Sequence, residues 1–199
     1  MMSSRPHWRT LLFCSLTLTL CLMVPAAVSD PGEAPGSHTL NPEEFSGVLV
    51  RSGNIYIAGQ PSRAGLELLK QTGVGVVVNL RTPNEMASLE FSEPTLLGDL
   101  GIHYVSLPSG GSEHPYSKET LQAFAEIVEQ ADADVLLHCR SAARASHLWV
   151  AYLVKYRGVS LPEALERGRA INFGTAPIEG YLEGEIEYRI APLKADESF

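Results

Sequence analysis

The chain has 199 residues, of which 15 are basic and 23 acidic, so its formal net charge is −8. A chain this acidic repels nucleic acid and anionic lipid at long range, and we expect neither as a partner. Any anionic substrate must therefore be bound by a local positive site within the fold.

The first 29 residues have the order of a secretory signal peptide. Arg5 and Arg9 precede an apolar run over residues 11–24, and Ala27-Val28-Ser29 offers a small-residue cleavage site. The alternative, an uncleaved anchor, is less favoured because the run is short for a span of about 20 residues. Cleavage removes both arginines, which leaves 13 basic residues and a net charge of −10. We therefore expect a periplasmic or secreted protein with no membrane contact after cleavage.

The mature chain begins with a lead-in and continues as one predicted domain. Residues 30–45 are rich in Pro, Gly, Ser and Glu, which predicts a flexible segment before a domain over 46–199. The domain opens with two predicted strands, 47–51 and 54–58, joined by a turn at Ser52-Gly53.

A helix and a buried strand are predicted next. Ser62 can cap the start of the helix and Gly73 is placed to end it. Residues 74–80 form a nearly continuous β-branched run, typical of a strand covered on both faces. Residues 83–99 are helical or loop, and Pro94 is expected to break them.

Residues 102–107 form the next predicted strand, and residues 108–116 an irregular loop rich in Gly and Pro. Ser117 then starts a helix with an apolar face. The members of that face are Leu121, Phe124, Ala125 and Val128. A short apolar strand over 135–138 follows, ending at Cys139.

Three further helices are predicted after Cys139. The first covers 144–156 and ends at Gly158. The second runs to Ala170 from a capping box of Ser160 and Glu163. The last spans 178–191. Strands that alternate with helices indicate an α/β fold with a mostly parallel central sheet flanked by helices.

Cys139 is the most informative residue of the chain. Cys14 and Cys21 leave with the signal peptide, so Cys139 is the only thiol of the mature protein. A lone cysteine in an exported protein has no internal disulfide partner. Its position at the end of a strand is where α/β sheets place their ligands.

The residues after Cys139 favour the binding of an anion. Arg140, Ser141, Ala142 and Ala143 form a short loop whose backbone amides can turn inward, and a helix then begins. Such a field stabilises a thiolate, and the guanidinium of Arg144 suits two oxygens of a phosphate or sulfate. The loop therefore predicts a nucleophile with an oxyanion-binding site around it.

His-Cys, a short loop and Arg resemble the cysteine-dependent phosphatases of the tyrosine and dual-specificity type. Four residues separate Cys139 from Arg144, a spacing shared with rhodanese-type sulfurtransferases. Three other segments resemble the phosphatase-like domain named after beta-lactamase hydrolase-like proteins, which has a dual-specificity-phosphatase fold. They are Asn54-Ile55-Tyr56-Ile57-Ala58-Gly59-Gln60-Pro61-Ser62, Val78-Asn79-Leu80-Arg81 with Glu85, and Gly101-Ile102-His103-Tyr104.

The resemblance implies a role for each residue of the loop. Cys139 would be the nucleophile, Arg144 would bind the substrate oxygens, and His138 would lower the thiol pKa. Two positions depart from the family: Ala142 replaces a glycine of positive φ, and Ala145 replaces a serine or threonine that assists the thiolate.

The proton donor is predicted less directly. Related phosphatases use an aspartate in the loop that corresponds to 108–116, where this chain offers only Glu113 and His114. Arg81 and Glu85 either form an ion pair that braces the catalytic loop or cap local structure. No metal or organic cofactor is implied.

The leading hypothesis is an exported phosphatase acting on a small-molecule or protein phosphate monoester. The first alternative is a sulfurtransferase that carries a persulfide on Cys139. The second is a catalytically silent module that binds an oxyanion, motivated by Ala142 and the absent aspartate.

Overall fold

The structure is a computed structural model that describes residues 42–174 and 178–182. Its strands are β1 (Leu49–Ser52), β2 (Ile55–Ala58), β3 (Val74–Asn79), β4 (His103–Ser106) and β5 (Asp134–His138). Its α-helices are α1 (Arg63–Leu69), α2 (Pro83–Met86), α3 (Glu93–Leu100), α4 (Lys118–Gln130), α5 (Ala143–Arg157) and α6 (Leu161–Arg169). Two 3-10 turns, η1 (Pro42–Glu44) and η2 (Lys70–Thr72), complete the set.

The five strands form one sheet in the order β1-β2-β5-β3-β4. β1 and β2 pair antiparallel as a hairpin, and all other neighbours are parallel. Gly53 allows the tight hairpin turn because it adopts a φ of 58°. The structure thus confirms the mostly parallel α/β sheet and the predicted hairpin.

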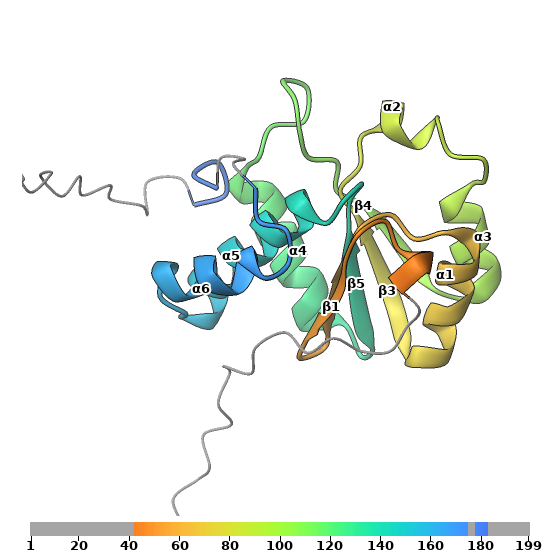
Figure 1. The fold of residues 1–199 in the computed structure, drawn as a ribbon, viewed down its shortest axis with the longest axis horizontal. Helices are drawn as coiled ribbons and strands as arrows, with labels where there is room; N and C mark the ends of the chain where they lie inside the picture. The colour runs from red at the N-terminus through yellow and green to blue at the C-terminus, as the bar shows by residue number, and fades with distance from the viewer. Residues whose placement is uncertain (1–41, 175–177, 183–199) are drawn as a thin grey trace, which may run out of the picture. The chain divides into compact units, whose positions relative to one another are not determined.

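Helices cover both faces of the sheet (Figure 1). Ile55, Ile57 and Leu137 point into a core shared with α4, α5 and α6. Tyr56 and Leu136, one residue out of phase, pack against α1 and α3 on the opposite face. Because side chains alternate along a strand, neighbouring residues of β5 serve two different cores.

Several predicted helix ends are confirmed by their local geometry. The hydroxyl of Ser62 accepts a hydrogen bond from the amide of Gly65 at the start of α1, and Ser117 caps α4 in the same way. The predicted apolar face of α4 is buried in the core. Gly158 ends α5 in the left-handed region, with φ 67°.

Three predictions about helices need correction. Pro94 lies in the first turn of α3 and does not break it, because a first-turn residue needs no amide hydrogen. Ser160 precedes α6 but its side chain makes no capping hydrogen bond, so the capping box with Glu163 is absent. Residues 178–182 form turns instead of the predicted helix, whose remaining part lies outside the described residues. Among the described residues, no helix has the length and apolar content of a membrane span.

Candidate active site

Cys139 directly follows β5, the strand that lies between β2 and β3 at the centre of the sheet. Its side chain is only 1% exposed, and its amide donates to the carbonyl of Ala58 at 3.3 Å. The thiol therefore stands at the carboxyl ends of three parallel strands. This is the edge at which open α/β sheets bind their ligands.

Two hydrogen bonds hold the loop after Cys139 by its carbonyl groups. The carbonyl of Arg140 accepts from the amide of Gln60 at 3.2 Å, and that of Ser141 accepts from Nδ2 of Asn172 at 2.6 Å. Both carbonyls are thus engaged by neighbouring segments. The peptide dipoles of the loop are fixed before any ligand arrives.

Ala142 makes the sharp turn from the loop into α5. Its φ of 66° and ψ of −10° are left-handed, a conformation that costs a residue with a Cβ about 1–2 kcal/mol. The side chain is fully buried. The positive φ expected at this position is therefore present, although the residue is alanine.

The N-terminus of α5 follows Ala142 directly. The helix has 15 residues, and no side chain caps its first turn. First-turn amides have no acceptor within their own helix, and the helix dipole adds positive potential there. An anion with several oxygens is the ligand that this end can accept.

Arg144 reaches back from the first turn of α5 to acceptors on three residues. Nη1 donates to Glu85 at 2.8 Å, to the carbonyl of Ser109 at 2.8 Å and to that of Leu80 at 3.2 Å, while Nη2 donates to Glu85 at 2.7 Å. The paired contacts with Glu85 use the terminal edge of the guanidinium, and the two carbonyl contacts also come from Nη1. Among the contacts of the described residues, Nε and one hydrogen of Nη2 stay open, and this second edge is a fork for two oxygens.

Glu85 combines the two roles that the sequence left open. It forms a capping box with Thr82 at the start of α2, and it pairs with Arg144. Nε of Arg81 lies 3.9 Å from the same carboxylate. Burial alone lowers the pKa of Arg144, but the hydrogen bond to Glu85 and the charges of Cys139 and Glu85 raise it overall.

Two tyrosines that the sequence did not single out belong to the electrostatic surroundings of Arg144 and Cys139. The rings of Tyr116 and Tyr181 meet edge to face with centroids 5.3 Å apart. Burial raises the pKa of both phenols, and the charges of Arg144 and Cys139 act on both. Tyr116 ends the irregular loop, whereas nothing in the local sequence of Tyr181 indicates that it reaches this site.

Gly110 lets the irregular loop turn beside the arginine in a backbone conformation that side chains rarely adopt. Its φ is 124°, and a Cβ there would lie 3.5 Å from Nη1 of Arg144. Glu113, on the same loop, is exposed and makes no hydrogen bond or ion pair within the described residues. The structure therefore leaves the proposed donor outside the cluster around Cys139.

His138 points away from the thiol, and the hydroxyl of Ser146 is engaged within its own helix. Nε2 of His138 lies 2.9 Å from a carboxylate oxygen of Glu93, on the face of the sheet that packs against α3. The hydroxyl of Ser146 donates to the carbonyl of Ala143 at 2.8 Å. Ala145 is fully buried, so no hydroxyl takes the position that assists the thiolate in the resembled family.

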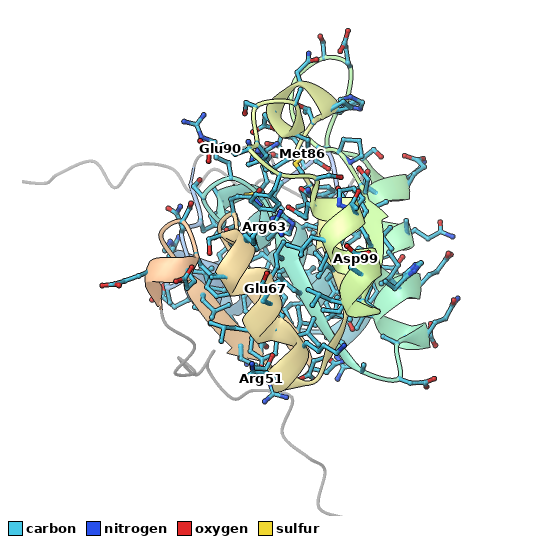
Figure 2. The ribbon with its side chains drawn as sticks, turned by 90° about the vertical axis from the view of Figure 1, so that its right-hand side faces the viewer. Arg51, Arg63, Glu67, Met86, Glu90 and Asp99 are labelled. Carbon is cyan, nitrogen blue, oxygen red and sulfur yellow. The ribbon has the colours of Figure 1, made fainter. Side chains whose placement is uncertain are left out.

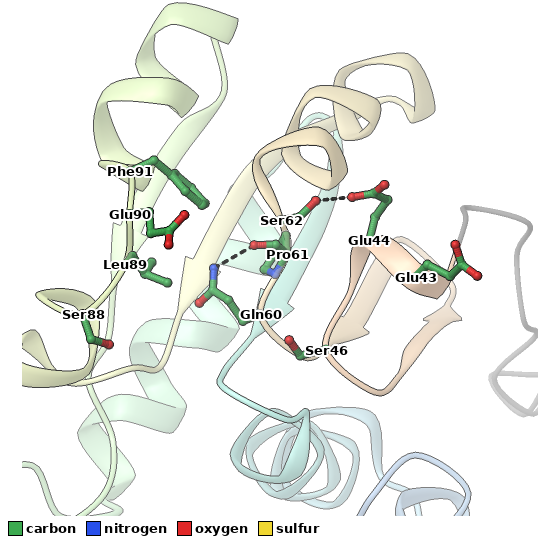
Figure 3. A pocket seen from close by; sticks show the side chains of 10 residues that line it. All are labelled: Glu43, Glu44, Ser46, Gln60, Pro61, Ser62, Ser88, Leu89, Glu90 and Phe91. Atoms are coloured by element: carbon green, nitrogen blue, oxygen red, sulfur yellow. Dashed lines mark hydrogen bonds between the residues drawn. The ribbon is translucent and has the colours of Figure 1, made fainter.

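A surface pocket lies between η1, the segment before α1 and the segment that joins α2 to α3 (Figure 3), and Cys139 is not among its lining residues. It is lined by Glu43, Glu44, Ser46, Gln60, Pro61, Ser62, Ser88, Leu89, Glu90 and Phe91. Within the described residues, no three His, Cys, Asp or Glu side chains are grouped to hold a metal ion.

The fold is shared with solved phosphatases. A P. aeruginosa TpbA form with cysteine replaced by serine, in complex with phosphotyrosine, is 18% identical, with a TM-score of 0.55 and coverage of 69% of this chain and 79% of its own. The active form of Tk-PTP is 24% identical, with a TM-score of 0.54 over 67% and 91%. Kinase associated phosphatase is 17% identical, with a TM-score of 0.56 over 65% and 83%.

No curated protein matches the chain. The sequence profile described as "DSP-PTPase phosphatase fused to NAD+ Kinase" matches residues 46–181, well over half of the chain. This match confirms the general resemblance to dual-specificity and tyrosine phosphatases, while the narrower one to beta-lactamase hydrolase-like proteins stays a prediction. The chain belongs to this DSP-PTPase family, whose members are cysteine-dependent phosphatases.

Proposed function

We propose that the chain is an exported enzyme that hydrolyses a phosphate monoester through a phosphocysteine intermediate on Cys139. One observation carries the proposal. The open edge of Arg144 and the uncapped N-terminus of α5 converge on the loop that begins at the thiol. These groups supply donors for the oxygens of a phosphoryl group beside a nucleophile.

The proposed reaction has two displacements at phosphorus. In the first, the thiolate of Cys139 forms a P–S bond while the ester P–O bond breaks, and the leaving oxygen takes a proton. Glu113, which is exposed in the structure, is the donor predicted from the sequence. In the second, water attacks phosphorus, the P–S bond breaks, and inorganic phosphate and the thiolate are released.

The substrate class follows from the anion site. TpbA was solved with phosphotyrosine, and in this chain the charges of Arg144 and Cys139 act on the partly exposed phenol of Tyr116. A phosphate monoester on a small molecule or on a protein side chain fits this site. A mature net charge of −10 disfavours nucleic acid and anionic membranes as partners.

Export is proposed from residues 1–29, which lie outside the described residues. Expression of the full chain in a bacterium with a periplasm, followed by fractionation and N-terminal sequencing, tests it. We expect an extracytoplasmic protein that begins at Asp30. A protein that stays in the cytoplasm with its N-terminus intact would contradict export without affecting the enzymatic proposal.

Turnover of p-nitrophenyl phosphate by the wild type and by Cys139→Ser tests the chemistry. We expect hydrolysis by the wild type, none by the variant, and a phosphorylated Cys139 peptide after rapid acid quenching. Sulfur transfer from thiosulfate to cyanide, measured in parallel, distinguishes the sulfurtransferase alternative from the phosphatase. Undiminished turnover in Cys139→Ser would refute the mechanism.

A further inference from the structure

A layer of buried polar side chains lies on the face of the sheet opposite α5. Strand register places Ala58, His138 and Asn79 in one row across β2, β5 and β3. Because side chains alternate, His138 points toward α3, although the next residue, Cys139, belongs to the core beneath α5. The residue before the nucleophile therefore connects the active-site loop to this polar layer.

Glu93 is the centre of that layer. It is fully buried at the start of α3, and its carboxylate contacts Nε2 of His138 at 2.9 Å, Nε2 of Gln60 at 2.8 Å and Nδ2 of Asn79 at 3.4 Å. Burial alone raises the pKa of Glu93, but the charge and hydrogen bond of His138 and the hydrogen bond from Gln60 lower it overall. Glu93 is thus a carboxylate, and Nε2 of His138 is the donor to it.

Gln60 connects Glu93 to Arg81 and to the loop after Cys139. Its Nε2 donates to Glu93, its Oε1 accepts from Nη1 of Arg81 at 2.7 Å, and its backbone amide donates to the carbonyl of Arg140. Arg81 then donates from Nη2 to the carbonyl of Glu85 at 2.9 Å. The amide orientation of Gln60 is determined by its partners, since one is a pure acceptor and the other a pure donor.

We propose that Glu93 and Gln60 are positioning residues that join the two ends of the catalytic loop. The contacts run from His138 through Glu93, Gln60, Arg81 and Glu85 to Arg144. One end precedes the nucleophile, and the other is the guanidinium that receives the substrate oxygens. This role rests on the proposed function, because it assigns both ends to one reaction.

Each hydrogen bond in this series has a fixed donor and a fixed acceptor, so a substitution that reverses one of these roles tests the proposal. Glu93→Gln introduces an amide nitrogen that faces Nε2 of Gln60, so two donors meet. If Gln60 flips to relieve this, its nitrogen faces Nη1 of Arg81. Either arrangement leaves a buried donor without an acceptor, a costly outcome for buried groups.

Gln60→Glu produces the opposite conflict, because two carboxylates then face each other. Combining the two substitutions places the amide at position 93 and the carboxylate at position 60. Gln at 93 accepts from His138 and donates to Glu at 60, whose second oxygen accepts from Arg81. The total charge equals that of the wild type, and only the weaker contact of Gln60 with the carbonyl of Pro61, at 3.1 Å, is lost.

The test is the rate at which iodoacetamide alkylates Cys139 in the full chain, read at its peptide by mass spectrometry. This rate reports the thiolate and needs no turnover, so it stays informative even if no phosphatase substrate is found. Five proteins are compared: the wild type, Glu93→Gln, Gln60→Glu, the double variant, and Asp99→Asn as control. Asp99 is exposed on the same helix as Glu93 (Figure 2), so it matches the charge change.

We expect each single substitution to slow alkylation about tenfold and the double variant to return within about threefold of the wild type. Asp99→Asn should match the wild type. If Glu93 affected Cys139 only through its negative charge, removing that charge in Glu93→Gln would favour the thiolate and speed alkylation. A faster or unchanged rate in Glu93→Gln therefore overturns the proposal. If the single variants are unfolded at the assay temperature, the double variant decides: a rate within threefold of wild type supports the proposal, and a larger loss overturns it.

Turnover of p-nitrophenyl phosphate gives a second readout. Because the network acts on the reacting groups, we expect kcat to fall more than KM rises in the single variants and to recover in the double variant. No turnover in the wild type would contradict the proposed function alone. A wild type that turns over, with single variants whose kcat is unchanged, would contradict the positioning role alone.

Discussion

Replacing Glu85 with Gln removes the carboxylate that receives both terminal nitrogens of Arg144, at 2.7 and 2.8 Å. Burial alone raises the pKa of Glu85. The hydrogen bonds from Arg144 and from the amide of Thr82, with the charges of Arg144 and Arg81, nevertheless lower it from 4.5 to about 2. The folded protein therefore stabilises the ionised carboxylate, and the substitution should reveal by how much.

The magnitude follows from this pKa difference. At about 1.4 kcal/mol per pH unit, the fall from 4.5 to about 2 corresponds to at most about 3 kcal/mol of folding free energy. The side chain is 26% exposed, and screening by solvent reduces this to about 1–2 kcal/mol. Because the folded pKa lies below the unfolded one, the stabilisation is complete above pH 4.5 and disappears as the pH falls toward 2.

Urea unfolding at pH 7 and pH 3 measures this contribution. We expect Glu85→Gln to be less stable than the wild type by about 1–2 kcal/mol at pH 7, and the gap to shrink at pH 3 as the wild type loses its carboxylate. Glu67→Gln, at an exposed position on α1 (Figure 2), is the control for the loss of one carboxylate. An equal pH dependence of the wild type and Glu85→Gln would refute the assignment of this ion pair as a stabilising one.

Three further predictions concern the loop and one helix end. Arg144→Lys loses the planar fork and the shared contacts with Glu85, so kcat for p-nitrophenyl phosphate should fall about a hundredfold or more; a smaller loss would show that the guanidinium is not required. Ala142→Gly should change the free energy of unfolding in urea by less than about 1 kcal/mol, because relief of the left-handed strain is offset by a lost buried methyl group and a more flexible unfolded chain. Ala142→Val should lower the same free energy by at least about 2 kcal/mol. Ser117→Ala removes the cap of α4 and should cost about 1 kcal/mol in the same measurement, and an unchanged midpoint would contradict that role.

Much of the fold was predictable because local patterns and tertiary packing agree. The β-branched run of β3 and the apolar face of α4 are both buried where their periodicity placed them. Local rules failed at two of the helix starts, although they held at Ser62 and Ser117. Pro94 is compatible with the first turn of a helix as well as with its end, and Ser160 begins α6 without using its side chain.

The loop was predictable because all its members are contiguous in sequence, whereas its surroundings were not. Glu93 precedes a proline at the start of a helix. An acidic side chain at such a position is ordinarily exposed to solvent and interacts favourably with the helix dipole. Its burial depends on how α3 docks on the sheet, which strand register decides. Tyr181 comes from a segment far along the chain, so its approach to Tyr116 has no local signal.

The strain at Ala142 is tolerated because the loop is held from several independent directions. Gln60 binds the carbonyl of Arg140 from the end of the β1–β2 hairpin, Asn172 binds that of Ser141 from beyond α6, and Glu85 fixes Arg144 from α2. A conformation that costs about 1–2 kcal/mol persists when its surroundings determine it in this way. A loop fixed in advance needs no reorganisation when charge develops on phosphorus oxygens, which is the property that the proposed reaction requires.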